Sequence, residues 1–143
     1  MVKITYPVPG FRIKEEDGKE WIFDEFRKQW VRLTPEEWVI QNMLQYLTQV
    51  KKYPASLIAI EKEITLGELR KRFDILVYKA SKPWMIVECK EMNVPLNESV
   101  MKQVLNYNIT VQADFVLITN GTDNYLFSLQ NGVAEELSEL PAY

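Results

Sequence analysis

Asp74, Glu88 and Lys90 are charged residues that lie inside or directly after two apolar runs, at 73–78 and 84–88. Both runs alternate and are rich in β-branched and aromatic residues, which predicts the two strands of an antiparallel hairpin. Because strand side chains alternate between two faces, Glu88 and Lys90 would share one face. Two neighbouring carboxylates repel unless a proton or a cation lies between them. The group therefore predicts a divalent metal ion held by Asp74 and Glu88, with Lys90 beside it.

The separation of Asp74 and Glu88 depends on the length of the hairpin loop. A three-residue loop at 80–82 would pair Tyr78 with Trp84 and, further along the ladder, Asp74 with Glu88. Residues directly opposite each other have Cβ atoms about 5 Å apart on one face. A loop of two or four residues would move Asp74 to the other face, so the predicted metal site depends on the three-residue loop.

The same charges have simpler interpretations. Asp74 could be a solvated residue at a strand end, and Glu88 with Lys90 could form an exposed ion pair. The strongly apolar runs beside them argue against this, because surface charge is less expected there. Arg70 and Arg72, at the start of the first strand, are either solvated or in contact with a phosphate group.

The composition limits the chemistry that the chain can perform. Its 143 residues suit one domain with a full core, and we expect a single domain over 1–143. It contains no histidine, which excludes histidine-dependent triads and zinc sites built from cysteine and histidine. The phosphate-binding loop of motor ATPases is also absent. A net charge of −3 argues against tight autonomous DNA binding, but not against a local basic patch.

The sequence also suggests a cellular location. No apolar run approaches the ~20 residues of a membrane span, and the first residues lack the apolar core of a signal peptide. The single Cys89 falls within a predicted strand and is expected to be a small core residue in a reducing compartment. These features predict a cytoplasmic protein without a membrane partner.

Residues 1–33 are predicted to form a β extension. The short runs FRIK and EWIF flank an Asp-Gly dipeptide at 17–18, which is a strong hairpin-turn signal. The following segment FRKQWVRL, at 26–33, is basic and aromatic. We interpret it as a solvated strand that packs Trp30 and Leu33 inward, with a phosphate-facing surface as the alternative.

A long helix is predicted from Thr34 to about Lys51. Thr34 is suited to the N-cap position, and Glu37 three residues later would complete a capping box. Apolar residues then recur along one side of the helix. Glu36 falls near the middle of that apolar stripe, so its carboxylate would point toward the core or toward a site beside it.

The rest of the chain alternates strands with one further helix. Strands are expected at 57–64, 114–119 and 124–129, a helix at 98–108 after an Asn97 N-cap, and an ill-defined acidic tail at 132–143. Gln103 and Tyr107 would share one face of that helix, and without further context they are an exposed polar residue and a packing aromatic. The fold class is α/β, a mixed β-sheet flanked by helices, with an N-terminal β-hairpin extension.

The order of these motifs resembles the N-terminal nuclease domain of type I restriction enzyme motor subunits, within the PD-(D/E)xK nuclease superfamily. The matching pieces are Pro35-Glu36-Glu37, Arg72-Phe73-Asp74, Glu88-Cys89-Lys90, and Gln103 with Tyr107. The resemblance covers residues 34–130 and leaves 131–143 as a tail. Phe73 replaces the proline of the motif, and neither the motor domains nor the N-terminal extension is matched.

The resemblance implies a restriction-endonuclease-like core that hydrolyses DNA with Mg²⁺, or with Mn²⁺ in its place. Asp74 and Glu88 would bind the metal together with the backbone carbonyl of Cys89, and Glu36 is a further candidate ligand. Lys90 would orient or activate the attacking water and stabilise charge on the phosphate.

The resemblance also implies residues that hold the nucleic acid. Gln103 and Tyr107 would act as a catalytic positioning pair near the metal and the DNA, and we expect Arg70 and Arg72 to contact the backbone. DNA is the expected partner, with restriction-modification subunits or a motor protein as further candidates. Two alternatives stay open: a non-catalytic module of the same fold that binds nucleic acid or a partner protein, and a nuclease acting on RNA or single strands.

Overall fold

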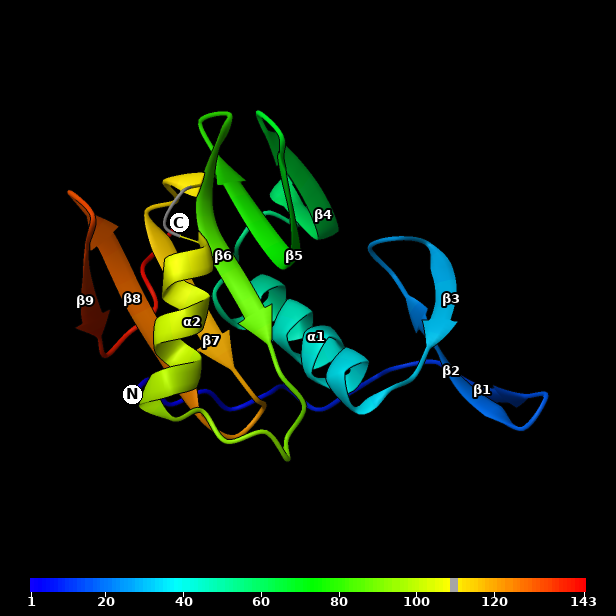
Figure 1. The fold of residues 1–143 in the computed structure, drawn as a ribbon. Coiled ribbons are helices and arrows are strands. Elements are labelled where there is room, and N and C mark those ends of the chain that lie inside the picture. The colour runs from blue at the N-terminus through cyan, green and yellow to red at the C-terminus, as the bar shows by residue number, and fades with distance from the viewer. Residues whose placement is uncertain (109–110) are drawn as a thin grey trace.

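Two β-sheets and two α-helices make up the fold of residues 1–108 and 111–143, which are the residues that the computed structural model describes (Figure 1). The strands are β1 (Ile13–Glu16), β2 (Lys19–Asp24), β3 (Gln29–Arg32), β4 (Ile58–Leu66), β5 (Leu69–Lys79), β6 (Lys82–Cys89), β7 (Phe115–Thr119), β8 (Asn124–Gln130) and β9 (Val133–Leu137). The helices are α1 (Pro35–Gln45) and α2 (Glu98–Asn108), with a π-helical turn at Tyr46–Val50 and a 3₁₀ turn at Ala55–Leu57.

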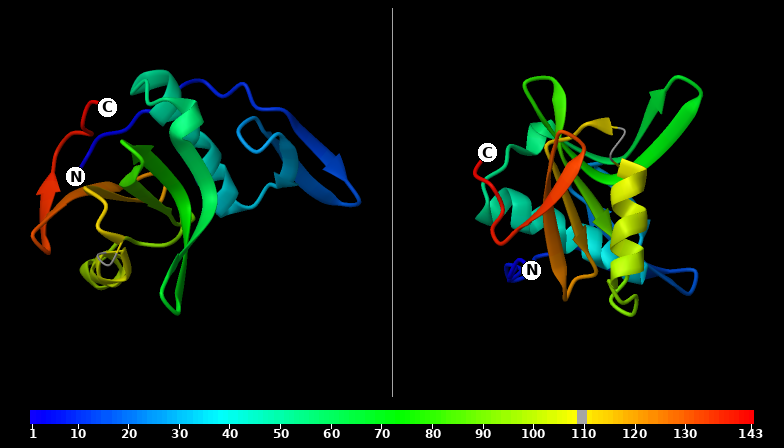
Figure 2. Two further views of the ribbon diagram at one scale, coloured as in Figure 1. Left: turned by 90° about the horizontal axis from the view of Figure 1, so that it is seen from above. Right: turned by 60° about the vertical axis from the view of Figure 1, so that its left-hand side comes forward.

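The larger sheet has the strand order β4-β5-β6-β7-β8-β9. Its neighbouring strands are antiparallel except for β6 and β7, which are parallel and are joined through α2. Helices α1 and α2 lie on opposite faces of this sheet (Figure 2). This arrangement confirms the predicted mixed α/β sheet flanked by helices.

Alternation along the central strands fills one core on each face of the sheet. Ile75, Val77 and Val87 pack on the side of α1, whereas Leu76 and Ile86 pack on the side of α2. All five side chains are fully buried. Burying each of them stabilises the fold by roughly 1.5–3 kcal/mol, so these strands form a rigid support for any polar group at their ends.

The alternation of β5 breaks at Asp74. Phe73 packs with the α2 core although Ile75, two residues later, packs with the α1 core. Glu61 of β4 lies opposite Asp74, between two regular backbone pairs, and its φ of 51° is in the left-handed region. A non-glycine residue rarely adopts that conformation within a strand, so both strands are distorted at the level of Asp74.

The turn between β5 and β6 differs from the prediction. It contains two residues, Ala80 and Ser81, with φ of 51° and 63°, as in the primed turns that fit the twist of a hairpin. The predicted three-residue loop is therefore wrong, and Tyr78 pairs with Pro83 rather than with Trp84.

A β-bulge next to this turn restores the predicted register further down the hairpin. The pairing shifts by one residue between Tyr78 and Val77, so that Val77 pairs with Met85. In the register that follows, Asp74 comes opposite Glu88. The extra residue in β6 compensates for the shorter turn, because a bulge places two residues of one strand against one of the other.

The N-terminal extension is a separate three-stranded sheet in the order β1-β2-β3. Asp17 and Gly18 form its first turn with φ of 55° and 73°, which confirms the predicted hairpin. The basic and aromatic segment supplies β3, and Trp30 and Leu33 are half-buried.

The C-terminal segment, predicted to be ill-defined, is ordered by the sheet. Val133–Leu137 forms β9 and pairs with β8. Leu140 is buried in the α1 core, and the Tyr143 hydroxyl donates a hydrogen bond of 2.8 Å to the carbonyl of Tyr78. Within the described residues, no helix is long and apolar enough to cross a membrane.

Candidate functional site

Asp74 and Glu88 form a pair of partly buried carboxyl groups on neighbouring strands. Asp74 Oδ2 accepts a hydrogen bond of 2.8 Å from the backbone N–H of Cys89, and the Asp74 and Glu88 side chains hydrogen-bond each other. Alternation along β6 turns Cys89 into the α1 core, whereas Glu88 lies on the α2 side. The hairpin thus brings together the two carboxylates that the sequence singled out.

Burial and mutual repulsion favour a proton on this pair of carboxyl groups. Burial and the neighbouring Asp74 carboxylate raise the pKa of Glu88 from 4.5 to about 8. Burial also raises the pKa of Asp74, although the Cys89 N–H and the Glu88 side chain act in the opposite direction. Two adjacent carboxylates cannot both ionise cheaply, so the pair favours sharing one proton in the absence of a cation.

Lys90 provides the positive charge of this cluster. Its backbone N–H donates to Thr119 O at 2.8 Å, which extends the β6–β7 pairing by one residue and fixes Lys90 beside the carboxylates. The charge of Lys90 lowers the pKa values of Asp74, Glu88 and Glu36.

Glu36 reaches the same cluster from the first turn of α1. It is exposed, so its carboxylate does not point into the core, which was one of the two predicted alternatives. Partial burial and the charge of Asp74 nevertheless raise its pKa, and Lys90 lowers it. Glu36, on α1, is therefore close enough to Asp74 and Lys90 to interact with their charges.

Asn108, at the end of α2, is a neighbour of Glu88 that the sequence did not indicate. Its side chain is fully buried, its Nδ2 donates to Val104 O at 3.0 Å, and it lowers the pKa of Glu88 by hydrogen bonding. Glu88 Oε1 and Asn108 Oδ1 are buried oxygens without a hydrogen-bond partner among the described residues. The sequence offered one signal for this role: Asn108 is a polar residue four positions after Val104, on the side of α2 that faces the sheet.

The donor set fits a hard divalent cation better than a soft one. Two carboxylates with a raised affinity for protons and a buried oxygen without a partner are groups that a cation would stabilise. Among the described residues, no group of three or more Asp, Glu, Cys or His side chains converges on one point. Asp74, Glu88 and the Cys89 carbonyl would thus leave several positions to water or phosphate oxygens, as Mg²⁺ prefers.

Tyr107 and Gln103 lie on the outer face of α2. The Tyr107 ring is 43% exposed, lies 6.4 Å from the ring of Phe73, and carries the Lys71 ammonium 4.2 Å from its centre. Gln103 is exposed one turn earlier. The described contacts of Tyr107 thus reach Phe73, the residue before Asp74.

Arg70 and Arg72 project from β5 into solvent. Arg70 lies 3.8 Å from Glu63, and both side chains are largely exposed. Arg72 donates to Glu61 Oε2 at 2.6 Å. Exposed ion pairs of this kind contribute at most about 1 kcal/mol, so both guanidinium groups can exchange their carboxylate for another anion.

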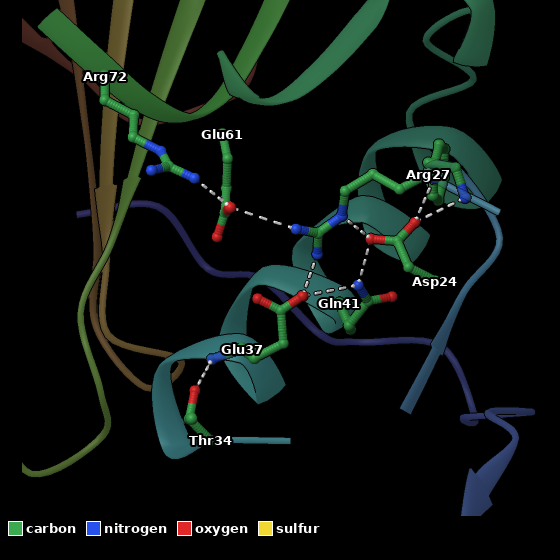
Figure 3. Close-up of polar contacts among 8 residues, drawn as sticks. Asp24, Arg27, Thr34, Glu37, Gln41, Glu61 and Arg72 are labelled. Atoms are coloured by element: carbon green, nitrogen blue, oxygen red, sulfur yellow. Dashed lines mark hydrogen bonds and ion pairs between the residues drawn. The ribbon is translucent and has the colours of Figure 1, made fainter. Parts of the chain in front are cut away.

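A buried ionic cluster joins the N-terminal extension to α1 (Figure 3). Arg27, from the β2–β3 turn, donates to Asp24 Oδ2 at 2.6 Å and to Glu37 Oε1. Gln41 donates to the same Asp24 oxygen at 2.8 Å. Burial tends to lower the pKa of Arg27, but the carboxylates of Asp24, Glu37 and Glu61 outweigh it and raise that pKa.

This cluster changes the interpretation of Glu37. Thr34 Oγ1 accepts a hydrogen bond from the Glu37 N–H, so Thr34 is the N-cap as predicted. The Glu37 carboxylate, however, turns to Arg27 and Gln41, and the Thr34 N–H bonds to Arg32 O. The predicted reciprocal capping box is therefore wrong, because an arginine from the extension binds the carboxylate.

Glu61 connects the ionic cluster to the carboxylate pair. Its carboxylate lies 2.6 Å from Arg72 and 3.5 Å from Arg27 (Figure 3), and its charge raises the pKa of Asp74. Its left-handed backbone is opposite Asp74 in the sheet. Strained residues of this kind persist where their surroundings hold them, and they concentrate at functional sites.

Comparison with known proteins agrees with this arrangement of elements. Residues 35–141 match the protein family described as "Type I restriction enzyme R protein N terminus (HSDR_N)". No curated protein matches the chain. The match begins at α1, includes α2 and every strand of the larger sheet, and leaves the β1–β3 extension outside. The chain belongs to the family of type I restriction enzyme R protein N termini.

Proposed function

We propose that this chain is a Mg²⁺-dependent nuclease domain that hydrolyses phosphodiester bonds in DNA. The observation that supports the proposal most directly is the placement of Asp74 opposite Glu88, with Lys90 at the end of the same strand. Family membership supports a role in a restriction system. Two adjacent carboxylates destabilise each other without a cation, so the closeness of the pair favours a bound metal ion.

Both carboxylates of the pair would serve as metal ligands in this proposal. Asp74 and Glu88, with the Cys89 carbonyl, would hold Mg²⁺, and Mn²⁺ would be accepted by the same oxygen ligands. The Cys89 N–H keeps Asp74 in place, so the first ligand is fixed by the strand that carries the second. When bound, the metal would supply Lewis-acid activation of water and neutralise charge on the scissile phosphate.

Lys90 would stabilise the negative charge that develops on the phosphate. The backbone N–H of Lys90 bonds to Thr119 O, which would hold this residue next to both carboxylates before substrate arrives. A pre-oriented charge of this kind stabilises a transition state without reorganisation. Glu36 would act as a second acidic group at the edge of the site, either through water to the metal or as a proton acceptor.

Gln103, Tyr107, Arg70 and Arg72 would hold the DNA around the carboxylates. All four side chains are exposed, and they come from the outer face of α2 and the start of β5. The partners proposed from the family are DNA and the restriction-modification subunits of a type I system. Separate motor domains would deliver the DNA.

Cleavage of plasmid and linear DNA in millimolar Mg²⁺ or Mn²⁺ tests the proposal. Asp74→Asn, Glu88→Gln and Lys90→Ala should each remove cleavage, with an effect of about 100-fold or more, because each removes a group that acts at the reacting phosphate. Asp114→Asn and Lys82→Ala serve as matched controls. These exposed residues lie at the other ends of β7 and β6, away from Cys89 and Thr119.

A non-catalytic module of the same fold is the alternative, and the net charge of −3 favours it over a free-standing nuclease. Wild-type protein that binds DNA but cleaves neither DNA nor RNA with either metal would support this alternative. Cleavage that survives both Asp74→Asn and Glu88→Gln would contradict the proposed site, even if the wild-type protein cleaves DNA.

A further inference from the structure

The β1–β3 sheet separates its charges onto two faces. Cross-strand partners lie on the same face of a sheet. One row across the sheet is Lys14, Trp21 and Arg32. The next row on that face is Arg12, Phe23 and Trp30. Phe23 pairs with Trp30, and its N–H donates a hydrogen bond to the Arg12 carbonyl. We call these six residues the aromatic–cationic face.

The opposite face of the same sheet has a different character. Its central row is Ile13, Ile22 and Val31, and Ile22 is fully buried. The acidic side chains Glu15 and Glu20 pair on this face. Ile22 is therefore the fully buried residue of this sheet, and it lies on the face opposite the three aromatic rings.

The aromatic–cationic face is open and positively charged. Trp21, Phe23 and Trp30 are each only half-buried. Cations lie over all three rings: Arg12 is 4.0 Å from the centre of Phe23, Lys14 is 4.6 Å from Trp30, and Arg32 is 5.6 Å from Trp21.

The last row of this face adds one cation and one acid. Lys19 pairs with Glu16, and Glu25 lies beside Arg12, so four cations (Arg12, Lys14, Lys19, Arg32) face two carboxylates, which leaves a surplus of two positive charges. The ion pairs that occupy some of these cations are weak. Arg12 lies 3.2 Å from Glu25 and Lys14 lies 2.9 Å from Glu16, and most of these side chains are more than half exposed.

From this geometry we infer that the aromatic–cationic face binds a single strand of nucleic acid. The cations would contact successive phosphates, and the half-exposed rings would stack on unpaired bases. Positive grooves lined by aromatic side chains are the usual means of binding single strands, since every base offers a ring face. An acidic chain can hold DNA in this way because the charge is concentrated on one face rather than spread over the surface.

The ionic cluster of Arg27 connects the sheet that carries this face to helix α1. Asp24, at the end of β2, and Arg27 bind Gln41 and Glu37 of α1, the helix whose first turn carries Glu36. A strand held on the sheet would thus be tethered to the helix that carries Glu36. This purpose rests on the proposed nuclease function, whereas binding by the face does not.

The test is binding in EDTA, which separates it from cleavage. The full chain carrying Asp74→Asn is titrated into a labelled 20-nucleotide oligo(dT), and anisotropy and tryptophan fluorescence are followed. We expect binding with quenched fluorescence. Trp21→Ala/Trp30→Ala should weaken it at least about tenfold, because base stacking on each ring contributes to affinity.

The charged residues are tested by the salt dependence of the same binding. Lys14→Gln/Arg32→Gln should reduce the slope of log K against log salt by about 1.4, or about 0.7 for each lost phosphate contact on a single strand. Lys82→Gln, at the exposed β5–β6 turn, is the matched control and should leave both affinity and slope unchanged. Circular dichroism and melting of each variant verify that the extension stays folded.

Four results would overturn the inference. The first is absence of binding, and the second is equal weakening of binding by Lys82→Gln. The third is equally tight binding of the matching duplex, with no effect of the tryptophan variants. The fourth is binding of polyaspartate that is lost in the tryptophan variants. The third result would mean that the face is electrostatic only, and the fourth would assign it to an acidic protein. None of them depends on whether Asp74 and Glu88 catalyse hydrolysis.

Discussion

The backbone N–H of Cys89 donates a hydrogen bond of 2.8 Å to Asp74 Oδ2. This bond crosses from β6 to β5 at the point where the alternation of β5 breaks, and it fixes Asp74 against the residue that lies between Glu88 and Lys90. The carboxylate therefore has a structural role as an acceptor in addition to any role as a metal ligand.

Substitutions at Asp74 should separate these two roles. Asp74→Asn keeps an oxygen acceptor for Cys89 and should retain most of the stability while abolishing the proposed cleavage. Asp74→Ala leaves the N–H unpaired, which should lower the free energy of unfolding by about 1–3 kcal/mol. Urea unfolding of both variants measures this difference. Equal stability of the two would mean that the hydrogen bond contributes nothing.

The stability of the metal-free protein should fall as pH rises through the range of Glu88. Its pKa is about 8 in the folded protein against 4.5 ordinarily. Between these values the unfolded chain has lost the proton and the folded chain retains it, so rising pH favours unfolding. The effect is absent below about pH 4.5 and complete above about pH 8, and it amounts to a few kcal/mol at most.

Glu88→Gln should remove this pH dependence. Because glutamine carries no titrating proton, the variant should gain stability relative to the wild type as the pH rises from 5 to 9, measured by thermal or urea unfolding. Asp114→Asn, at an exposed position, should follow the wild type. Parallel pH curves for the wild type and Glu88→Gln would contradict the buried proton.

Asn108 should act on the site through Glu88. Asn108→Leu removes the amide that lowers the pKa of Glu88, so Mg²⁺ binding should require a higher pH, since the metal must displace the Glu88 proton. Calorimetric titration across pH measures this midpoint. Asn106→Leu, on the exposed side of α2, should leave it unchanged. A loss of stability without a shifted midpoint would reduce Asn108 to a packing residue.

Arg27 should be essential to the docking of the extension. Arg27→Met leaves Asp24 and Glu37 buried without their cation, which should cost about 3–5 kcal/mol. Lys28→Met changes the neighbouring residue, whose side chain is 75% exposed, and should cost less than about 0.5 kcal/mol. Hydrogen exchange should show β1–β3 losing protection in Arg27→Met before the larger sheet. Uniform loss across both sheets would instead indicate one cooperative unit.

Local patterns in the sequence determined much of the fold. Asn97 caps α2, with its Oδ1 accepting from the Val100 N–H at 2.9 Å, and α2 spans the predicted Glu98–Asn108. The Asp-Gly turn at 17–18 and the strands β4 to β8 of the larger sheet were also predictable, whereas β9 falls in the segment predicted to be an ill-defined tail. These features depend on residues close in the chain, where periodicity, capping and turn chemistry act directly. The family resemblance, carried by short motifs in order, is confirmed by the family match.

The tertiary structure decided how the charged residues are placed. The register that brings Asp74 opposite Glu88 comes from a bulge, which compensates for a turn shorter than predicted. Asn108 reaches Glu88 only because α2 packs on the same face of the sheet. The Asn108 contact has no local signal, since it joins residues from distant elements. The pairing of Asp74 with Glu88 was predicted, but from a loop length that the structure does not have.

The ionic cluster shows the same limit. Glu37 had the spacing of a capping box, but Arg27, ten residues earlier, takes its carboxylate once the extension packs on α1. A buried arginine requires carboxylates around it, and that long-range requirement outweighs a local cap. The sequence by itself thus determined which residues carry charge and which elements hold them. Packing between distant elements decided which charges meet, because burial sets the energy of each ionised group.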